Sequence, residues 1–172
     1  RAFKKSVGLN GVGIKAVNAL SSSFSVQSRR EGQTKRVEFE RAKILYDGEV
    51  VPCDEPQGTE VCFTPDATLF RNYQFREEYV VAMLRNYTFL NAGLTIYNGK
   101  KFLSRHGLQD LLNEDLTGDP LYPVIHLQSD DIEVAITHIN QYGEEFYSFV
   151  NGQNTTQGGT HLSAFRESVA RV

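Results

Sequence analysis

GLNGVG, residues Gly8-Leu9-Asn10-Gly11-Val12-Gly13, runs directly into the pattern IKAVNALS of residues 14–21. Apolar residues recur in that pattern at Ile14, Val17 and Leu20, which is the spacing of one helix face. Because glycine has no Cβ, a loop with three glycines in six residues can turn tightly and approach a ligand closely. The first amides of the following helix point outward without partners. The stretch therefore predicts a phosphate cradle, and hence a nucleotide-binding chain.

The glycine spacing itself matches neither common phosphate-loop template. G-x-x-G-x-G differs from G-x-G-x-x-G, and Lys15 follows Gly13 too soon, with no Ser or Thr after it, for a P-loop. On the glycines alone, a tight turn that binds nothing is an equal alternative.

The wider sequence favours the nucleotide reading through a resemblance. Residues 8–21 resemble the glycine-rich lid of the ATPase subunits of bacterial type IIA DNA topoisomerases, gyrase and topoisomerase IV. Three further segments resemble the same family in the same order: residues 58–66 (GTEVCFTPD), 89–94 (FLNAGL) and 158–166 (GGTHLSAFR). The four matches span nearly the whole chain.

The resemblance implies an α+β fold. Residues 1–118 would form the back half of a GHKL (Bergerat) ATPase sandwich, a mixed sheet with helices on one face. Residues 119–172 would begin a ribosomal-S5-like α/β transducer domain. The turn residues Gly118-Asp119-Pro120 mark the expected boundary.

The hydrophobic pattern predicts the elements within these parts. Helices are expected over residues 14–21, for four turns from Phe75, over 108–112 and from Thr160. Hairpins are expected around residues 30–33 and 98–99, and strands over 60–64, 124–127, 132–139 and 146–150. Residues 50–57 and 151–159 read as loops.

The resemblance also implies ATP and Mg²⁺ as cofactors, and it indicates candidate binding residues. The lid loop on the phosphates would consist of Leu9, Asn10, Gly11, Val12 and Gly13. Thr59 would lie near the adenine, and Arg30 at the mouth of the pocket, a position associated with coumarin-type inhibitors. Without the resemblance, Thr59 reads as an ordinary strand residue and Arg30 as a surface hairpin arginine.

Other positions carry no predicted chemistry. Phe3 stands where many family members have a phosphate-contacting tyrosine, and its ring has no hydroxyl. Gln33-Thr34-Lys35 spells a family motif, but in an early hairpin, so we assign Lys35 no catalytic role. His161 is expected to shape a helix start. The family's glutamate base, its Mg²⁺-binding asparagine and its adenine-reading aspartate precede the lid. We therefore expect no catalytic residue here and no ATP hydrolysis by this segment alone.

Composition restricts the partners. The net charge of −3 argues against broad nucleic-acid binding by this segment. The four histidines lack zinc-ligand spacing, so no metal site made only of protein side chains is expected. Cys53 and Cys62, with Cys62 expected to be buried, suit a reducing cytoplasm. No apolar run could span a membrane. The resemblance implies DNA, the topoisomerase A subunit and a second ATPase domain as partners of the intact protein.

Two alternatives stay open. The chain could belong to another GHKL ATPase, MutL-like or chaperone-like, although the FLNAG and GGTH segments argue against this. It could also be a non-enzymatic interaction module whose glycine loop only turns the chain. Within the leading family, Asn10 and Ile14-Lys15 favour topoisomerase IV over gyrase without deciding between them.

Overall fold

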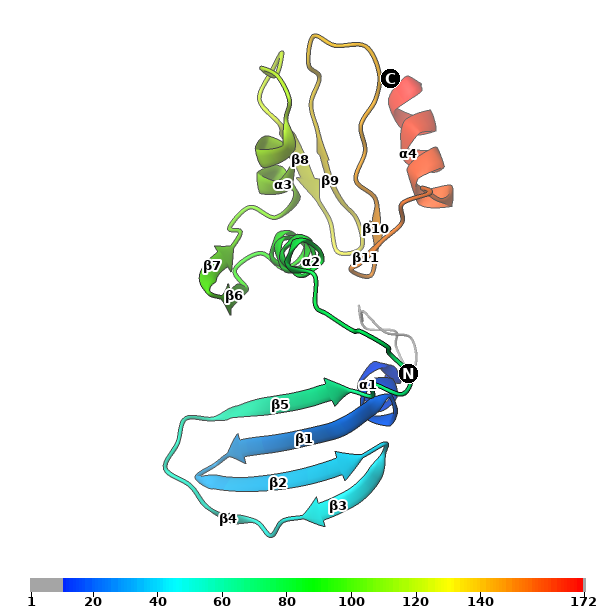
Figure 1. Ribbon diagram of the computed structural model, residues 1–172. Helices are drawn as coiled ribbons and strands as arrows, with labels where there is room; N and C mark the ends of the chain where they lie inside the picture. Colours follow the sequence, from blue (N-terminus) through cyan, green and yellow to red (C-terminus); the bar gives the residue numbers. More distant parts are fainter. Residues whose placement is uncertain (1–10, 172) are drawn as a thin grey trace. The chain divides into compact units, whose positions relative to one another are not determined.

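The computed structural model describes residues 11–171 and divides into two compact units between Gln74 and Phe75. Figure 1 shows an antiparallel sheet with one short helix in the first unit, and three helices with short hairpins in the second. The predicted α+β class is confirmed. None of the helices within residues 11–171 is long and apolar enough to cross a membrane.

The first unit is built around one twisted sheet. Helix α1 (Gly13–Ala19) leads into β1 (Ser21–Arg30), and four strands follow: β2 (Gln33–Glu40), β3 (Lys43–Asp47), β4 (Val51–Pro52) and β5 (Gly58–Pro65). The strand order is β3-β2-β1-β5, and β4 pairs with β2. Helix α1 contacts β1, β2 and β5.

The β1–β2 hairpin forms where the sequence predicts it. Its two-residue loop, Glu31-Gly32, has φ values of 54° and 72°. Positive φ at both loop residues is the conformation whose twist matches that of the flanking strands. The resulting register pairs Val26 with Val37 and Arg30 with Gln33.

One face of this sheet is apolar. Phe24 pairs with Phe39 on β2 and Phe63 on β5, and Val26 pairs with Val61 in the same way. Phe24 is buried at 3% exposure, whereas Val61 and Phe63 remain 41% and 42% exposed. Burial on this face is therefore confined to the part of the sheet near Phe24.

The second unit joins its elements in series. It comprises α2 (Glu77–Leu90), β6 (Thr95–Asn98), β7 (Lys100–Leu103), α3 (Leu108–Asp115), β8 (Ile125–Gln128), β9 (Glu133–Ile136), β10 (Phe149–Val150), β11 (Gln153–Asn154) and α4 (Thr160–Ala170). Helix α2 contacts β6, β7 and α3, and α3 contacts β8 and β9. Phe89, Phe102 and Leu111 are the buried apolar residues where these elements meet.

Several expectations need correction. Every strand pairing among residues 11–171 is antiparallel, not mixed, because the paired strands are joined by hairpin turns or by loops without a crossover helix. Residues 50–57 include β4, which pairs with Gln33 and Thr34, and residues 151–159 include β11. Cys62 is exposed, because it lies on the edge strand β5 and on the polar face of the sheet.

The expected boundary at residues 118–119 lies inside the second unit. There, α3, which precedes the boundary, contacts β8 and β9, which follow it. The division into an ATPase part and a transducer part stays a prediction.

Candidate nucleotide-binding site

The glycine-rich loop enters the described part of the chain at Gly11. Gly11 has φ +61°, and a Cβ built there would meet nothing within 4 Å. The left-handed backbone, not crowding, is therefore what favours glycine at this position. Leu9 and Asn10 lie outside the described residues.

Helix α1 begins without a side-chain cap. Val12 occupies the N-cap position and accepts the first helical hydrogen bond, from Ala16 N at 2.9 Å, but its side chain caps nothing. The first turn contains no acidic residue, and Val12 and Ile14 are 57% and 53% exposed. The amides at the start of α1 are therefore open to water or to an anion.

Thr59 lies near the beginning of β5, opposite Ser28 of β1. Pro65, at the other end of β5, pairs with Ser21, the residue that opens β1 just after α1. The strand rises about 3.3 Å per residue, so Thr59 and Pro65 lie roughly 20 Å apart. Thr59 thus lies at one end of β5, and the C-terminal end of α1 adjoins the other end of that strand.

Arg30 lies on the same sheet face as Ser28 and Thr59, because side chains two apart on a strand point to the same side. Its Nε is 3.0 Å from Glu31 Oε1, and both side chains are about three-quarters exposed. Its neighbour Arg29 points to the other face, where its Nε is 2.5 Å from Glu55 and its Nη2 is 3.3 Å from Glu60. Arg29 therefore holds strands together, while Arg30 is accessible.

The structure also reveals a polar cluster that the sequence did not single out, formed by Asp66, Arg41 and Thr68 (the Asp66 cluster). The Asp66 side chain is 3% exposed and forms an ion pair with Arg41. It also accepts hydrogen bonds from Thr68 N at 2.9 Å and Thr68 Oγ1 at 2.7 Å. The Arg41 guanidinium and these two donors hold the pKa of Asp66 well below its usual range. The only sequence signal was its place at the end of the GTEVCFTPD motif.

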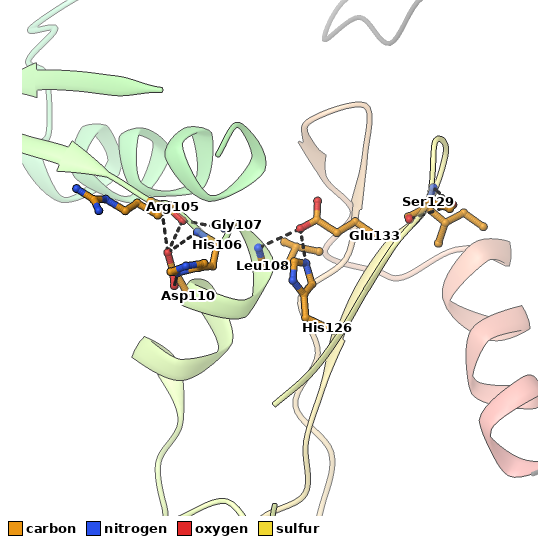
Figure 2. Close-up of polar contacts among 10 residues, drawn as sticks. Arg105, His106, Gly107, Leu108, Asp110, His126, Ser129 and Glu133 are labelled. Atoms are coloured by element: carbon orange, nitrogen blue, oxygen red, sulfur yellow. Dashed lines mark hydrogen bonds and ion pairs between the residues drawn. The ribbon is translucent and has the colours of Figure 1, made fainter. Parts of the chain in front are cut away.

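A second polar cluster surrounds the start of α3 (Figure 2). Asp110 Oδ2 accepts hydrogen bonds from Ser104 Oγ, Arg105 N and His106 N at 2.8–3.0 Å. Although partial burial opposes the shift, these hydrogen bonds lower the pKa of Asp110 to about 2. The cluster satisfies amides just before α3 with a carboxylate from its own first turn.

Glu133 of β9 reaches the same helix start from the other side. Its Oε1 accepts a hydrogen bond from Leu108 N at 3.3 Å and lies 2.9 Å from His126 Nε2. A Cβ at Gly107, which has φ +58°, would come within 2.8 Å of that oxygen. A cavity of about 230 Å³ adjoins His126 and Glu133. These contacts dock the β8–β9 hairpin onto α3.

Two further positions have structural partners. His161 Nε2 lies 2.6 Å from Ser148 Oγ, which also accepts a hydrogen bond from Thr155 Oγ1, so His161 ties the start of α4 to the β10–β11 hairpin. Lys35 Nζ lies 2.7 Å from Asp47 on β3. Among residues 11–171, no group of three His, Cys, Asp or Glu residues could hold a metal ion.

Comparison with known proteins gives consistent matches. The family model described as DNA gyrase B matches residues 100–172. The B subunit of topoisomerase IV from Borreliella burgdorferi is 44% identical over 99% of this chain, which spans 28% of that protein. The B subunit of DNA gyrase from Eisenibacter elegans is 35% identical over 99% of the chain, which spans 40% of it.

Solved structures agree with these sequence matches. The 43K ATPase domain of Thermus thermophilus gyrase B, solved in complex with an aminocoumarin, superposes with a TM-score of 0.78 at 32% identity. That match covers 94% of this chain and 48% of the other. The B-subunit of Myxococcus xanthus gyrase shares the fold, with a TM-score of 0.69 at 23% identity.

Proposed function

Because this chain belongs to the family of bacterial gyrase B and topoisomerase IV B subunits, we propose that it is part of the ATP-binding subunit of a type II DNA topoisomerase. The chain spans well under half of the relatives it matches, so the activity is that of the longer protein. That protein would couple ATP binding and hydrolysis to the passage of one DNA duplex through another. Its partners would be DNA, the A subunit and a second ATPase domain, in the cytoplasm.

Within this segment, we propose that the loop of Leu9, Asn10, Gly11, Val12 and Gly13 binds the ATP phosphates. The observation that carries this proposal is Gly11, whose left-handed backbone leads into a helix start that has no side-chain cap. Neutral amides of this kind bind a polyanion with little rearrangement. Mg²⁺, when bound, would bridge the phosphates and neutralise part of their charge.

Thr59 and Arg30 would serve the other end of the nucleotide. A nucleotide is elongated, with its base at one end and its phosphates at the other. Thr59 is far along β5 from Pro65, beside which α1 ends, and the phosphates would bind at the opposite end of that helix, its start. Thr59 would hydrogen-bond near the adenine. Arg30, two residues beyond the Thr59 partner on the same face, would line the mouth where coumarin-type inhibitors bind.

This segment would bind and orient the nucleotide without supplying a general base. Glu31 is paired with Arg30 on an exposed turn, and Glu60 is paired with Arg29 on the opposite sheet face from Thr59. Neither carboxylate is placed to activate a water at the phosphate end. Hydrolysis would require residues from another part of the protein.

Between the two kinds of enzyme, we propose topoisomerase IV. The chain is 44% identical to the Borreliella burgdorferi topoisomerase IV protein and 29–35% identical to seven gyrase B proteins. Reconstitution of the full-length protein with its A subunit distinguishes the two. Decatenation without negative supercoiling supports topoisomerase IV, and ATP-dependent negative supercoiling refutes it.

Titration calorimetry of the full-length protein with a non-hydrolysable ATP analogue tests the nucleotide site. Thr59→Ala should weaken binding roughly tenfold, because one hydrogen bond in a desolvated pocket is lost. Thr59→Ser keeps the hydroxyl and should bind nearly as the wild type does. Lys35→Gln should leave ATP hydrolysis unchanged. If the wild-type protein binds no nucleotide, the glycine loop only turns the chain and the proposal is wrong.

A further inference from the structure

We propose that Asp66 and Arg41 are positioning residues that fix the C-terminal end of α1, so that the glycine-rich loop at its other end is presented to the nucleotide. This inference rests on the nucleotide-binding function proposed above. It concerns residues that lie outside the loop, outside the Thr59 position and outside the pocket mouth.

The contacts that carry the inference converge where α1 becomes β1. Asp66 N donates to Leu20 O at 3.0 Å, and Arg41 N donates to Ser21 O at 3.0 Å. Ser21, whose exposure is 1%, donates its hydroxyl to Val17 O within α1 at 2.6 Å. The side chains of Asp66 and Arg41 then pair with each other. Backbone hydrogen bonds thus join the end of β5 and the β2–β3 turn to the residues that follow α1, and the buried Asp66 carboxylate joins the end of β5 to that turn.

The two ends of α1 differ sharply. The two residues that follow it, Leu20 and Ser21, accept backbone hydrogen bonds from Asp66 and Arg41. Its start, by contrast, has no side-chain cap and exposes Val12 and Ile14. The helix contains only seven residues, too few to be stable without tertiary contacts. The Asp66 cluster therefore supplies order that α1 does not have by itself.

The β2–β3 turn adds a second reason to assign Arg41 this role. Arg41 and Ala42 have φ values of 46° and 64°, a left-handed conformation that residues with a side chain rarely adopt. Neither residue is glycine, so the turn is unfavourable in isolation. The ion pair with Asp66 and the hydrogen bond to Ser21 O hold Arg41 in it. Strain of this kind persists where surrounding contacts impose one geometry.

Loss of the cluster should act on nucleotide affinity. If α1 is docked only part of the time, the apparent dissociation constant rises by the inverse of the docked fraction. A fall in that fraction to about one-tenth raises Kd and KM about tenfold. Once nucleotide is bound, α1 is docked in the variants as in the wild type, so kcat should change little.

The test compares variants of the full-length protein. Asp66→Asn removes the charge and keeps the shape, Arg41→Gln removes its partner, and Thr68→Val removes one donor while leaving the ion pair. Arg36→Gln is the matched control, because Arg36 lies on β2, the strand that leads into the Arg41 turn, and pairs with Glu38 at 2.7 Å on the surface. Binding of a non-hydrolysable ATP analogue, steady-state hydrolysis and amide hydrogen exchange of residues 13–19 are measured.

Asp66→Asn and Arg41→Gln should raise Kd and KM about tenfold, leave kcat within about twofold and accelerate exchange in α1. Arg41→Lys should recover part of the affinity, Thr68→Val should give an intermediate loss, and Arg36→Gln should match the wild type. If Asp66→Asn does not fold, Arg41→Lys and Thr68→Val still provide the graded comparison.

Two results would overturn the inference. One is faster exchange in α1 with unchanged nucleotide affinity, which would mean that docking of α1 does not control the loop. The other is an equal loss of affinity in Arg36→Gln, which would indicate a general effect of charge. If the wild-type protein binds no nucleotide, the proposed function fails, and the exchange data alone judge whether the cluster fixes α1.

Discussion

Two adjacent arginines show how a strand assigns different roles to identical residues. Arg29 is 19% exposed and pairs with Glu55 and Glu60 on one sheet face. Arg30 is 75% exposed on the other face, the one that carries Thr59, and pairs with its neighbour Glu31. Strand alternation alone separates a stabilising arginine from an accessible one.

If Arg30 lines the pocket mouth as proposed, Arg30→Gln should weaken aminocoumarin binding to the full-length protein by roughly tenfold, because a charged hydrogen-bond donor is lost there. Its urea unfolding midpoint should stay unchanged, since an exposed pair contributes little. Arg29→Gln is the matched comparison. It should lower the free energy of unfolding by about 1 kcal/mol and leave the aminocoumarin affinity unchanged. Unchanged aminocoumarin affinity in Arg30→Gln would contradict the placement of Arg30.

Single residues also show where the sequence predicts backbone conformation and where it does not. Gly11 and Gly32 adopt the positive φ values that their glycines suggest. Arg41 and Ala42 adopt positive φ values with no glycine to indicate it, so the β2–β3 turn left no signal. Asp66 could be placed in a family motif, but its burial depends on Arg41, 25 residues away. Pairings of that kind follow from the tertiary fold and cannot be read from spacing.

At the scale of elements, a carboxylate from the first turn of α3 holds the segment that leads into that helix. Asp110 accepts hydrogen bonds from Ser104, Arg105 and His106, and its pKa is about 2 against an ordinary value of 3.8. A lowered folded-state pKa means that the charged form stabilises the fold. This contribution is complete above about pH 4 and is lost as the pH falls towards 2.

We expect Asp110→Asn to be destabilised at pH 7 by an amount on the order of 2 kcal/mol, and to lose much of the wild-type fall in stability between pH 4 and pH 2. Urea unfolding free energies measured across that range provide the test. Asp130→Asn, an exposed substitution in the β8–β9 turn, should keep the wild-type pH dependence. Parallel pH curves for Asp110→Asn and the wild type would show that the charge of Asp110 does not stabilise the fold.

Elements with strong periodicity or a glycine turn were predicted well. The amphipathic α2 and the hairpins at Glu31-Gly32 and around Gly99 form as expected. The sequence did not predict the strands β3, β4 and β11. Strands β4 and β11 are only two residues long, and β3, Lys43-Ile44-Leu45-Tyr46-Asp47, does not alternate apolar with polar residues. Their formation depends on pairing with a neighbouring strand, which local sequence does not encode.

At the scale of the whole molecule, few apolar side chains are covered. In the described part of the chain, the buried large apolar residues are Phe24, Phe89, Phe102 and Leu111. A chain of 172 residues is long enough to bury a larger core than this. Apolar residues on β5 and β8 that alternate in the manner of core positions, such as Phe63 and Leu127, remain 42% and 61% exposed. The relatives are two to four times longer, which leaves ample additional chain to cover such faces in the intact protein.

This segment on its own should therefore bind the dye ANS strongly and unfold at a low temperature, because contiguous exposed apolar surface attracts the dye and contributes no burial energy. The full-length protein should bind little ANS and unfold cooperatively at a higher temperature.

A double substitution on β5, Val61→Thr with Phe63→Thr, tests which surface binds the dye. Threonine is β-branched and suits a strand, but it removes apolar surface, so the double variant of the segment should bind less ANS. In the full-length protein the same substitutions should be destabilising, on the order of 2–5 kcal/mol, if those side chains are covered there. A segment that shows no ANS fluorescence and melts as sharply as the full-length protein would mean that its apolar faces need no further chain to cover them.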